Sequence, residues 1–509
     1  MVFRGKPSKA CHRCRERRLK CDLVKPRCTQ CLRAGRKCPG YRPQSNDRFL
    51  DQTAEVVFKA RLAEDARTEQ RQSDQAMTKE LPRSLSLPIE ARATSFFLSN
   101  FIQGSNFEYL PSLYAPYSVR EEHLSASIEA VGLASLSNEL RSLQASKQGR
   151  KRYIHAIQAT NTALRSPVRA TEDSTLLSVL LLSLYEAITC TTQLTLCLWE
   201  SHIKGAMALI RLRGRQQMNT QLGLQLLSQT TFSVAISAHR NMAAVPTEIT
   251  SLVTHALQYA SENDPSWSLK LISFRAADLR AAIRSGSLSD PDVIIAAAMQ
   301  LDHDFVLWSS TLPPSWQFKT VLAEHADGTL VYEGYYHLYS THGIARSMNA
   351  WRMLRMQLKL TIREQILRQH TSPLRSQDYT TLMRHAESII TQLASEICAT
   401  IPQYVELPAR VPISVSKTQP PHSTISDIPL PKTESSTSGF THAARSYGVI
   451  WPLMSVATCP VCHSSRRAWI INRLQYIGRQ MNNPQALLAV KILERNWDVD
   501  IRMHLCHLL

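Results

Sequence analysis

Apolar residues recur at helical spacing through most of the chain, from about Pro82 onward. The segment Leu176–Tyr185 is apolar on nearly all sides, which is typical of a central buried helix. One face of a long amphipathic helix is indicated by apolar residues at intervals of three and four: Ile344, Met348, Trp351, Leu354, Leu358, Ile362 and Ile366. Strand-like alternation is scarce. The pattern therefore predicts an all-α fold for residues 82–509.

Residues 407–440 interrupt this helical pattern. They are rich in Pro, Ser and Thr and hold few apolar residues. Such a segment buries too little apolar surface to offset the entropy of ordering it. We expect a disordered surface loop within the helical body.

Residues 43–81 form a polar junction before the body. The stretch up to Gln52 predicts a linker, and residues 53–75 predict a polar helix. An apolar stripe begins at Val56 and Ala60, but polar residues occupy its continuation, so fewer than about three heptads are supported. A solvated helix is the preferred interpretation, and a weak homodimer is the most that this segment supports.

Positive charge is concentrated at the N-terminus. The chain has 59 Lys/Arg and 41 Asp/Glu, a net charge of +18, and residues 1–48 hold 15 of the basic and 3 of the acidic residues, a net of +12. A small basic module attached to a nearly neutral body is typical of a nucleic-acid-binding head on a larger domain.

Common enzyme signatures do not occur in the sequence. Gly is 16 of 509 residues, and there is no Gly-rich dinucleotide or phosphate loop, nucleophile elbow or H-E-x-x-H motif. We therefore expect no enzymatic activity. The polar, basic segment Met1–Lys9 predicts no secretory signal. The most apolar run, Leu176–Cys190, contains Glu186 and is too short to span a membrane, so we expect no membrane partner.

Six of the 12 cysteines lie close together near the N-terminus, with the spacing C-x2-C-x6-C-x6-C-x2-C-x6-C. They are Cys11, Cys14, Cys21, Cys28, Cys31 and Cys38. The second half of the motif repeats the first, and three thiolates per half cannot complete a tetrahedral zinc site. Both halves reach four ligands if two cysteines bridge two metals, so the count indicates a cluster of two zinc ions and six cysteines.

The segment ACHRCRERRLKCDLVKPRCTQCLRAGRKCPGY resembles the DNA-binding domain of the fungal zinc binuclear cluster (Zn2Cys6) transcription factors. The resemblance covers all six cysteines, the basic run Arg15–Lys20 and the loop residue Pro26. It implies two Zn(2+) ions per chain, with Cys11 and Cys28 bridging them. It further assigns the remaining ligands, Cys14 and Cys21 to one zinc and Cys31 and Cys38 to the other.

The first half of the motif is expected to read DNA. A helix from about Cys11 to Lys20 would point its C-terminal end into the major groove of double-stranded DNA. The resemblance implies that Arg17 and Arg18 contact the bases of a CGG triplet; many relatives have lysine where Arg18 stands. His12 is expected to face solvent or phosphate and not the metal. The other basic residues are expected to contact phosphates: Lys9, Arg13, Arg15, Lys20, Lys25 and Arg27.

The body resembles the all-helical regulatory region of one class of these factors. The matching stretches are FKARLAEDAR, SFFLSNFIQG, DSTLLSVLLLSLYEAI, LWESHIKGAMALIRLRG and WPLMSVATCPVC with RAWIINRLQYIG. The resemblance implies a helical domain whose partners include co-regulators or a small-molecule effector. The expected organisation is a Zn2Cys6 domain at residues 8–42, the junction at 43–81 and the regulatory domain at 82–509.

The remaining cysteines are expected to be thiols without metal. Cys459, Cys462 and His463 have zinc-knuckle spacing, but no second C-x2-C pair accompanies them. A group near the C-terminus offers further ligand types: His504, Cys506 and His507. Three others are interpreted as core residues: Cys190, Cys197 and Cys398.

The sequence as a whole predicts a nuclear, sequence-specific regulator of RNA polymerase II transcription. Two other classes of protein stay open. A catalytic body tethered to DNA would need a convergent set of catalytic polar groups, and a zinc-headed scaffold that binds only protein would show no salt-dependent affinity for DNA. Nothing in the sequence distinguishes an activator from a repressor.

Overall fold

The computed structural model describes residues 10–41, 87–102, 105–113, 121–189, 196–261, 264–323, 328, 330–369, 376–405 and 442–494. The chain divides into two compact units, Met1–Gln52 and Thr53–Leu509. The junction helix at 53–75 and the loop at 407–440, both predicted from the sequence, lie outside the described residues.

The first unit holds two short helices, α1 (His12–Glu16) and α2 (Thr29–Arg33). Its buried residues are four of the cysteines, with the other two, Ala10 and Tyr41 packed against them. A unit this small cannot bury enough apolar surface to fold on a core of its own. Its stability therefore needs a source other than an apolar core, and metal binding by the cysteines would supply one.

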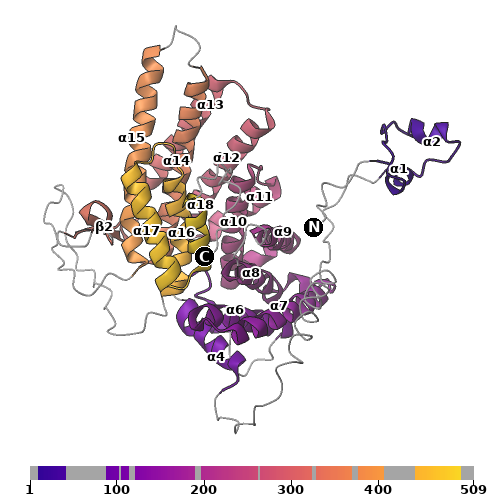
Figure 1. Ribbon diagram of the computed structural model, residues 1–509, viewed down its shortest axis with the longest axis horizontal. Coiled ribbons are helices and arrows are strands. Elements are labelled where there is room, and N and C mark those ends of the chain that lie inside the picture. Colours follow the sequence, from indigo (N-terminus) through magenta and orange to yellow (C-terminus); the bar gives the residue numbers. More distant parts are fainter. Residues whose placement is uncertain are drawn as a thin grey trace. The chain divides into compact units, whose positions relative to one another are not determined.

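The second unit is built of helices (Figure 1). In chain order it begins with α4 (Ile89–Phe96), the π-helical η1 (Phe97–Phe101), α5 (Leu110–Leu113), α6 (Glu122–Leu140), α7 (Leu143–Leu164), η2 (Arg169–Thr171), α8 (Asp173–Ile188), α9 (Leu196–Arg213), η4 (Gly214–Asn219), α10 (Gln221–Asn241), α11 (Thr247–Ala256) and η5 (Leu257–Tyr259). It continues with α12 (Ser266–Ser285), α13 (Pro291–Ser310), η6 (Pro314–Trp316), β1 (Lys319–Leu322), η7 (Tyr332–Gly334), β2 (Tyr335–Leu338), α14 (His342–Gln369), α15 (Ser376–Thr400), η9 (Ile401–Gln403), α16 (His442–Ala457), α17 (Ser464–Gln480) and α18 (Pro484–Glu494). The small head and large all-α body predicted from the sequence are confirmed.

Several helices begin at side chains that cap their first turn. The Ser142 hydroxyl accepts a hydrogen bond from the Ala145 N–H at the start of α7, and Thr220 does the same for Gly223 at the start of α10. At α13 the Asp290 carboxylate accepts from the Asp292 N–H. These bonds satisfy backbone donors that the helix itself leaves unpaired.

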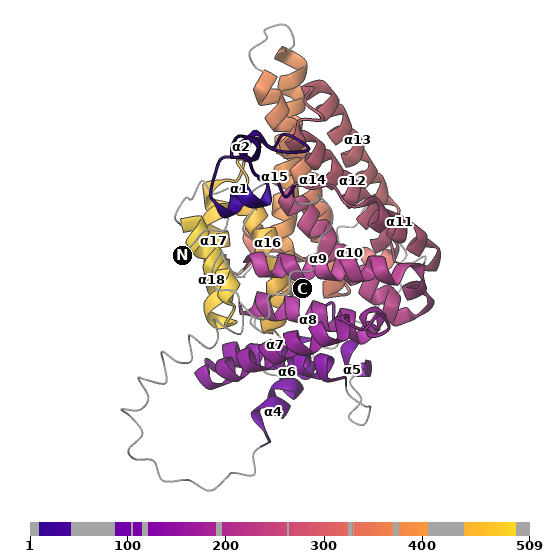
Figure 2. The same cartoon turned by 90° about the vertical axis from the view of Figure 1, so that its right-hand side faces the viewer.

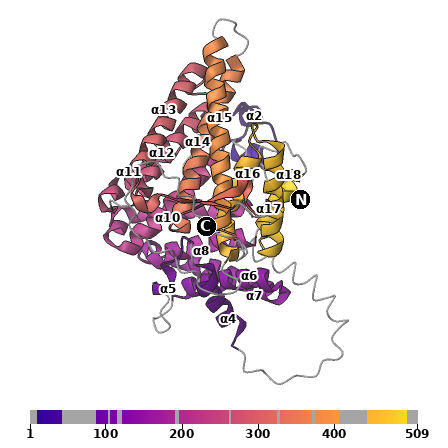
Figure 3. The ribbon, with the colours of Figure 1, turned by 90° about the vertical axis from the view of Figure 1, so that its left-hand side faces the viewer.

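The central helix of the body is α8, as the apolar run predicts. Every residue from Thr175 to Ile188 is buried. Helices α6, α7, α9 and α10 pack around α8. Figures 2 and 3 show α6 and α7 side by side at one end of the body, and α13 to α15 extending toward the opposite end.

The predicted face of the long helix α14 is largely buried, with Ile344 and Leu354 half-buried, and α14 packs against its neighbours α13 and α15. Buried ion pairs add to this packing. Asp302 of α13 accepts from Arg355 and Lys359 of α14, each at 2.7 Å, and Arg352 donates to Glu396 of α15 at 2.9 Å. Pairing keeps these charges from being buried alone, which would strongly destabilise the fold.

A small hairpin departs from the all-helical expectation. Strands β1 and β2 pair antiparallel, with Lys319 opposite Leu338 and Leu322 opposite Tyr335. Each strand has four residues, too few for an alternating pattern to stand out from the helical background.

Candidate metal centre and nucleic-acid interface

The six N-terminal cysteines lie in two overlapping groups of four. One group holds Cys11, Cys14, Cys21 and Cys28, and the other holds Cys11, Cys28, Cys31 and Cys38; within each group all Sγ atoms lie within 4.8 Å of one another. Cys11 and Cys28 belong to both groups. The structure thus brings together all six residues that the spacing singled out, as two neighbouring sets of four thiols.

Three of the sulfur–sulfur distances are those expected of zinc ligands. They are 3.7 Å for Cys11–Cys28, 3.8 Å for Cys11–Cys31 and 3.7 Å for Cys14–Cys28. Zn–S bonds of about 2.3 Å in a tetrahedral site place neighbouring sulfurs about 3.8 Å apart. A disulfide would need about 2.05 Å. The donor set and these distances therefore fit zinc, and Cys11 and Cys28 could serve both groups of thiols.

The backbone places the cysteines through one local structure used twice. Cys11 and Cys28 stand directly before α1 and α2, and Cys14 and Cys31 lie inside these helices. Counterparts in the two halves are 17 residues apart, as Cys11 and Cys28 show. The repeat seen in the sequence is thus also a repeat in structure.

Both helices end in the same reversal. The Leu19 N–H donates to the Cys14 carbonyl at 2.8 Å, and the Arg36 N–H donates to the Cys31 carbonyl at 3.1 Å. This six-residue closure requires a left-handed residue just before the donor, which is usually glycine. In the second half that residue is Gly35 (φ 62°), but in the first half it is Arg18 (φ 53°).

The predicted helix from Cys11 to Lys20 is too long. It ends at Glu16, because the chain must reverse at Arg18 for Cys21 to return to the cluster. Arg17 and Arg18 consequently lie in the turn after α1, and both are exposed. They stand beside the C-terminal end of α1, where its last carbonyls face outward.

The other predicted DNA contacts fall in different surroundings. Lys20, Lys25 and Arg27 are exposed. Arg13 is half-buried and its Nη1 lies 3.8 Å from Cys31 Sγ, so its charge faces the thiolate cluster. Lys9 and the side chain of Arg15 lie outside the described residues.

His12 faces solvent. Its Nδ1 lies 3.6 Å from Glu16 Oε1, one turn along α1, and it belongs to neither group of thiols. That His12 does not bind the metal stays a prediction.

Burial sets the protonation of the central thiols. Removal from water raises the pKa of Cys11 to about 12 and raises the pKa of Cys28 as well. Hydrogen bonds from backbone N–H groups lower the pKa of Cys38 to about 7. Thiolates bind metal, so a cation that displaces the protons of the shared thiols relieves their desolvation. Two Zn(2+) and six thiolates would together carry a charge of about −2, which the surrounding arginines and lysines outweigh.

Two side chains missed by the sequence reasoning tie the head together. Asp22 accepts from the Thr29 N–H at 3.1 Å at the start of α2, and the Tyr41 hydroxyl donates to the Val24 carbonyl at 2.7 Å. The Lys25–Pro26 peptide bond in this loop is cis. No local motif marks Asp22 or Tyr41, because their partners lie seven and 17 residues away.

The zinc-knuckle-like segment of the body takes a different form. Cys459 is buried, Cys462 is half-buried and His463 is exposed, with His463 Nδ1 3.0 Å from Ser465 Oγ. Cys398 is fully buried on α15, as predicted for a core residue. Within the described ranges, the two cysteine groups of the head are the metal-type clusters found. Five of the predicted candidates lie where the structure describes no side chain: Cys190, Cys197, His504, Cys506 and His507.

Two family profiles match the chain. Residues 9–48 match the fungal Zn(2)-Cys(6) binuclear cluster domain, and residues 93–260 match the fungal specific transcription factor domain. The second match runs from α4 through η5. Three of the five stretches that resemble the regulatory region of these factors lie within this match, and the other two lie outside it.

The aspercryptin biosynthesis cluster-specific transcription regulator of Emericella nidulans is 38% identical to the chain over 60 residues. The match covers 12% of this chain and 10% of that regulator. No solved structure matches the chain. The two domains and this relative support a fungal Zn2Cys6 transcription factor, and with it a DNA-binding transcription regulator. None of the described helices combines the length and apolar character needed to cross a membrane.

Proposed function

We propose that the chain is a nuclear, sequence-specific regulator of RNA polymerase II genes that reads a CGG triplet in double-stranded DNA. One observation carries the proposal: two four-thiol groups share Cys11 and Cys28, and the turn that follows α1 presents the exposed residues Arg17 and Arg18. The thiols that could bind metal, the end of α1 and the basic side chains occur together in one small unit.

Two Zn(2+) ions would hold the head in its fold. The four ligands of one ion would be Cys11, Cys14, Cys21 and Cys28, and those of the other Cys11, Cys28, Cys31 and Cys38. Zinc–thiolate bonding supplies the free energy that a larger domain draws from its core. The shared cysteines are then the bridging ligands.

The chain's own residues would read the bases at the end of α1. The guanidinium of Arg18 can donate two parallel hydrogen bonds to O6 and N7 of a guanine, and Arg17 stands next to it on the same turn. Backbone carbonyls at the helix end can accept from the N4 amino group of cytosine. These donors and acceptors fit a C·G, G·C, G·C triplet.

Phosphate contacts would position the head without specifying sequence. Lys20, Lys25 and Arg27 are exposed on the same unit and carry no ion pair among the described residues. Lys9 and Arg15 are proposed on sequence alone. The contact of Arg13 with Cys31 makes Arg13 the weakest member of the set, since part of its charge is directed at the cluster.

The proposed organisation follows the sequence: a DNA-binding domain at 8–42, a junction at 43–81 and a helical regulatory domain at 82–509. Co-regulators are proposed as partners of the body, and at most a weak homodimer is proposed as its assembly. A titration of CGG and scrambled duplexes with the full chain tests the proposal. Zinc-dependent, salt-sensitive preference for CGG is expected, whereas equal affinity for both duplexes would favour a scaffold or another role.

A further inference from the structure

The helical body contains a cavity of about 740 Å³. Helices α10, α12, α14 and α16 supply most of its lining, and α8, the loop before α5 and the segment between η5 and α12 contribute further residues. The volume falls within the range of about 300–1,000 Å³ that is usual for small-molecule sites. The space is large enough for a compact organic ligand.

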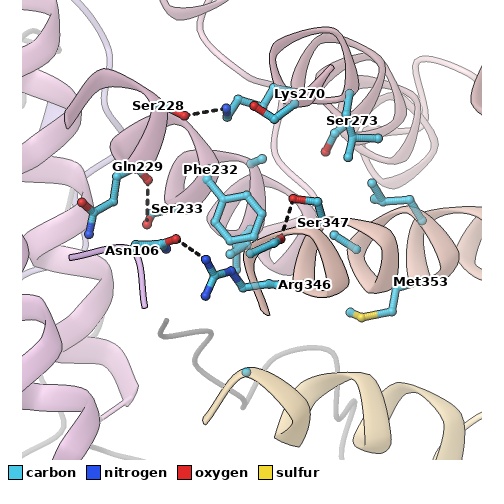
Figure 4. A pocket seen from close by; sticks show the side chains of 18 of the residues that line it. Asn106, Ser228, Gln229, Phe232, Ser233, Lys270, Ser273, Arg346, Ser347 and Met353 are labelled. Atoms are coloured by element: carbon cyan, nitrogen blue, oxygen red, sulfur yellow. Dashed lines mark hydrogen bonds between the residues drawn. The ribbon is translucent and has the colours of Figure 1, made fainter. Parts of the chain in front are cut away.

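Much of the lining is apolar. The Phe232 ring projects into the cavity from α10, and Met353 lines it from α14 (Figure 4). Trp267 of α12 and Trp451 of α16 lie on other walls. This lining favours a ligand with an apolar, ring-sized body.

A buried lysine stands in this apolar wall. Lys270 of α12 is only 6% exposed, its Nζ donates to Ser228 Oγ at 2.8 Å, and the same atom lies 4.4 Å from the centre of the Trp267 ring (Figure 4). Within the described part of the chain no carboxylate forms an ion pair with it. Burial lowers the pKa of Lys270 to about 8, and the attraction of Asp264 only partly offsets this.

An ammonium offers three donors, and a hydroxyl and an aromatic face do not neutralise it. A buried charge without a counter-ion is unfavourable. An anionic group placed beside Lys270 would supply that counter-charge. The cavity therefore favours a ligand that places an acidic group beside Lys270.

The whole lining is also weakly positive. Its basic side chains are Arg240, Lys270, Arg280 and Arg346, and its acidic side chains are Glu108, Asp264 and Glu364. A hydrogen bond of 2.6 Å already holds Arg346 to Asn106, so Arg346 is committed to the protein (Figure 4). One net positive charge and one unneutralised lysine favour a ligand with a single acidic group.

We propose that the helical body binds a small apolar molecule with one acidic group, held with the acid beside Lys270 and the apolar part against Phe232 and Trp267. This binding does not depend on the DNA-reading function of the head. It would join α10 and α12 to α14 and α16, elements far apart in the chain, and so stabilise the body in proportion to ligand concentration.

Two fluorescent probes with the same ring system separate charge from apolar contact. The acidic probe is 1-anilinonaphthalene-8-sulfonate, and the neutral probe is N-phenyl-1-naphthylamine. We expect the acidic probe to bind the full chain saturably, one per chain. Replacement of Lys270 by Met should lower the affinity for the acidic probe about tenfold or more and leave the affinity for the neutral probe within about twofold of wild type. The same change at Lys204, an exposed lysine of α9, serves as the control and should alter neither.

Two further variants keep the test decisive. Lys270→Arg retains the charge and should hold the acidic probe within about threefold of wild type, while Phe232→Trp fills the cavity and should weaken both probes. Equal losses of both probes in Lys270→Met, or acidic-probe binding that ignores both Lys270→Met and Phe232→Trp, would overturn the proposal. The titrations contain no DNA, so failure of the CGG proposal would leave their outcome unchanged.

Discussion

Because Arg18 has a left-handed backbone conformation, a substitution there can raise the stability of the head and lower its affinity for DNA. Arg18 has φ 53° at the position where the second half of the motif uses Gly35. Such a conformation costs an L-residue about 1–2 kcal/mol. Glycine avoids this cost but loses about 0.5–1 kcal/mol more conformational freedom on folding. Arg18→Gly should therefore stabilise the zinc-loaded head by about 0.5–1 kcal/mol, the difference between these two effects.

Gly35 offers the matched reverse experiment. A Cβ built on Gly35 meets nothing within 4 Å, so Gly35→Ala changes only the backbone term. It should destabilise the head by about the same 0.5–1 kcal/mol. Chelator competition on the full chain measures both effects, as about two- to fivefold greater zinc retention for Arg18→Gly and a similar loss for Gly35→Ala.

DNA binding should respond in the opposite direction. Arg18→Gly removes the proposed contact to guanine, and affinity for CGG should fall by about 1–3 kcal/mol despite the more stable head. Arg18→Ala should lose the same DNA affinity without the gain in zinc retention. Fluorescence anisotropy on CGG and mismatched duplexes measures this. The reasoning is refuted if Arg18→Gly and Arg18→Ala retain zinc equally, or if Arg18→Gly keeps full preference for CGG.

Three further predictions concern the metal, the phosphates and the body. Elemental analysis should find two zinc ions per chain; Cys11→Ala should damage both sites, and Cys14→Ala mainly one. Lys25→Ala should weaken binding to CGG and other duplexes alike and reduce the salt slope by about one, as salt titrations can show. Burial raises the pKa of Glu186 from 4.5 to about 7, with Tyr153 donating to it, so the folded body holds a proton that the unfolded chain releases. Glu186 therefore lowers the free energy of unfolding progressively as pH rises from 4.5 through 7. Glu186→Gln removes this loss, so the variant should gain about 3 kcal/mol more in free energy of unfolding at pH 8 than at pH 4, measured from denaturant midpoints.

Each of these predictions has a contrary result. One zinc ion per chain would exclude bridging cysteines. A change in base preference for Lys25→Ala would make that residue a base reader. Equal effects of Glu186→Gln on stability at low and high pH would show that folding does not raise the pKa of Glu186.

The cysteine spacing predicted the site more fully than it predicted the local fold. Three ligands per half and an exact repeat determine which residues gather, because the metal geometry needs four thiolates per ion. The helix expected from about Cys11 to Lys20 was nevertheless too long, because α1 ends at Glu16. Return of Cys21 to the cluster forces a reversal at Arg18, and tertiary closure of this kind outweighs the helical preference of arginine.

In the body, helical periodicity predicted α8 and the buried face of α14 because each pattern is long and local. The cavity could not be found in this way. Ser228 and Lys270 are 42 residues apart, and their meeting depends on how α10 packs against α12. The hairpin of β1 and β2 was missed for a related reason, since four-residue strands gain their stability from pairing rather than from local pattern.

Selection from a pool of random duplexes by the zinc-loaded full chain tests the central claim most directly, because it asks which sequence the head prefers without assuming one. The chain should enrich duplexes containing a CGG triplet, and the enrichment should vanish when zinc is removed by a chelator. Enrichment of an unrelated sequence, or the same CGG enrichment without zinc, would contradict the account of a two-zinc head that reads this triplet through Arg17 and Arg18.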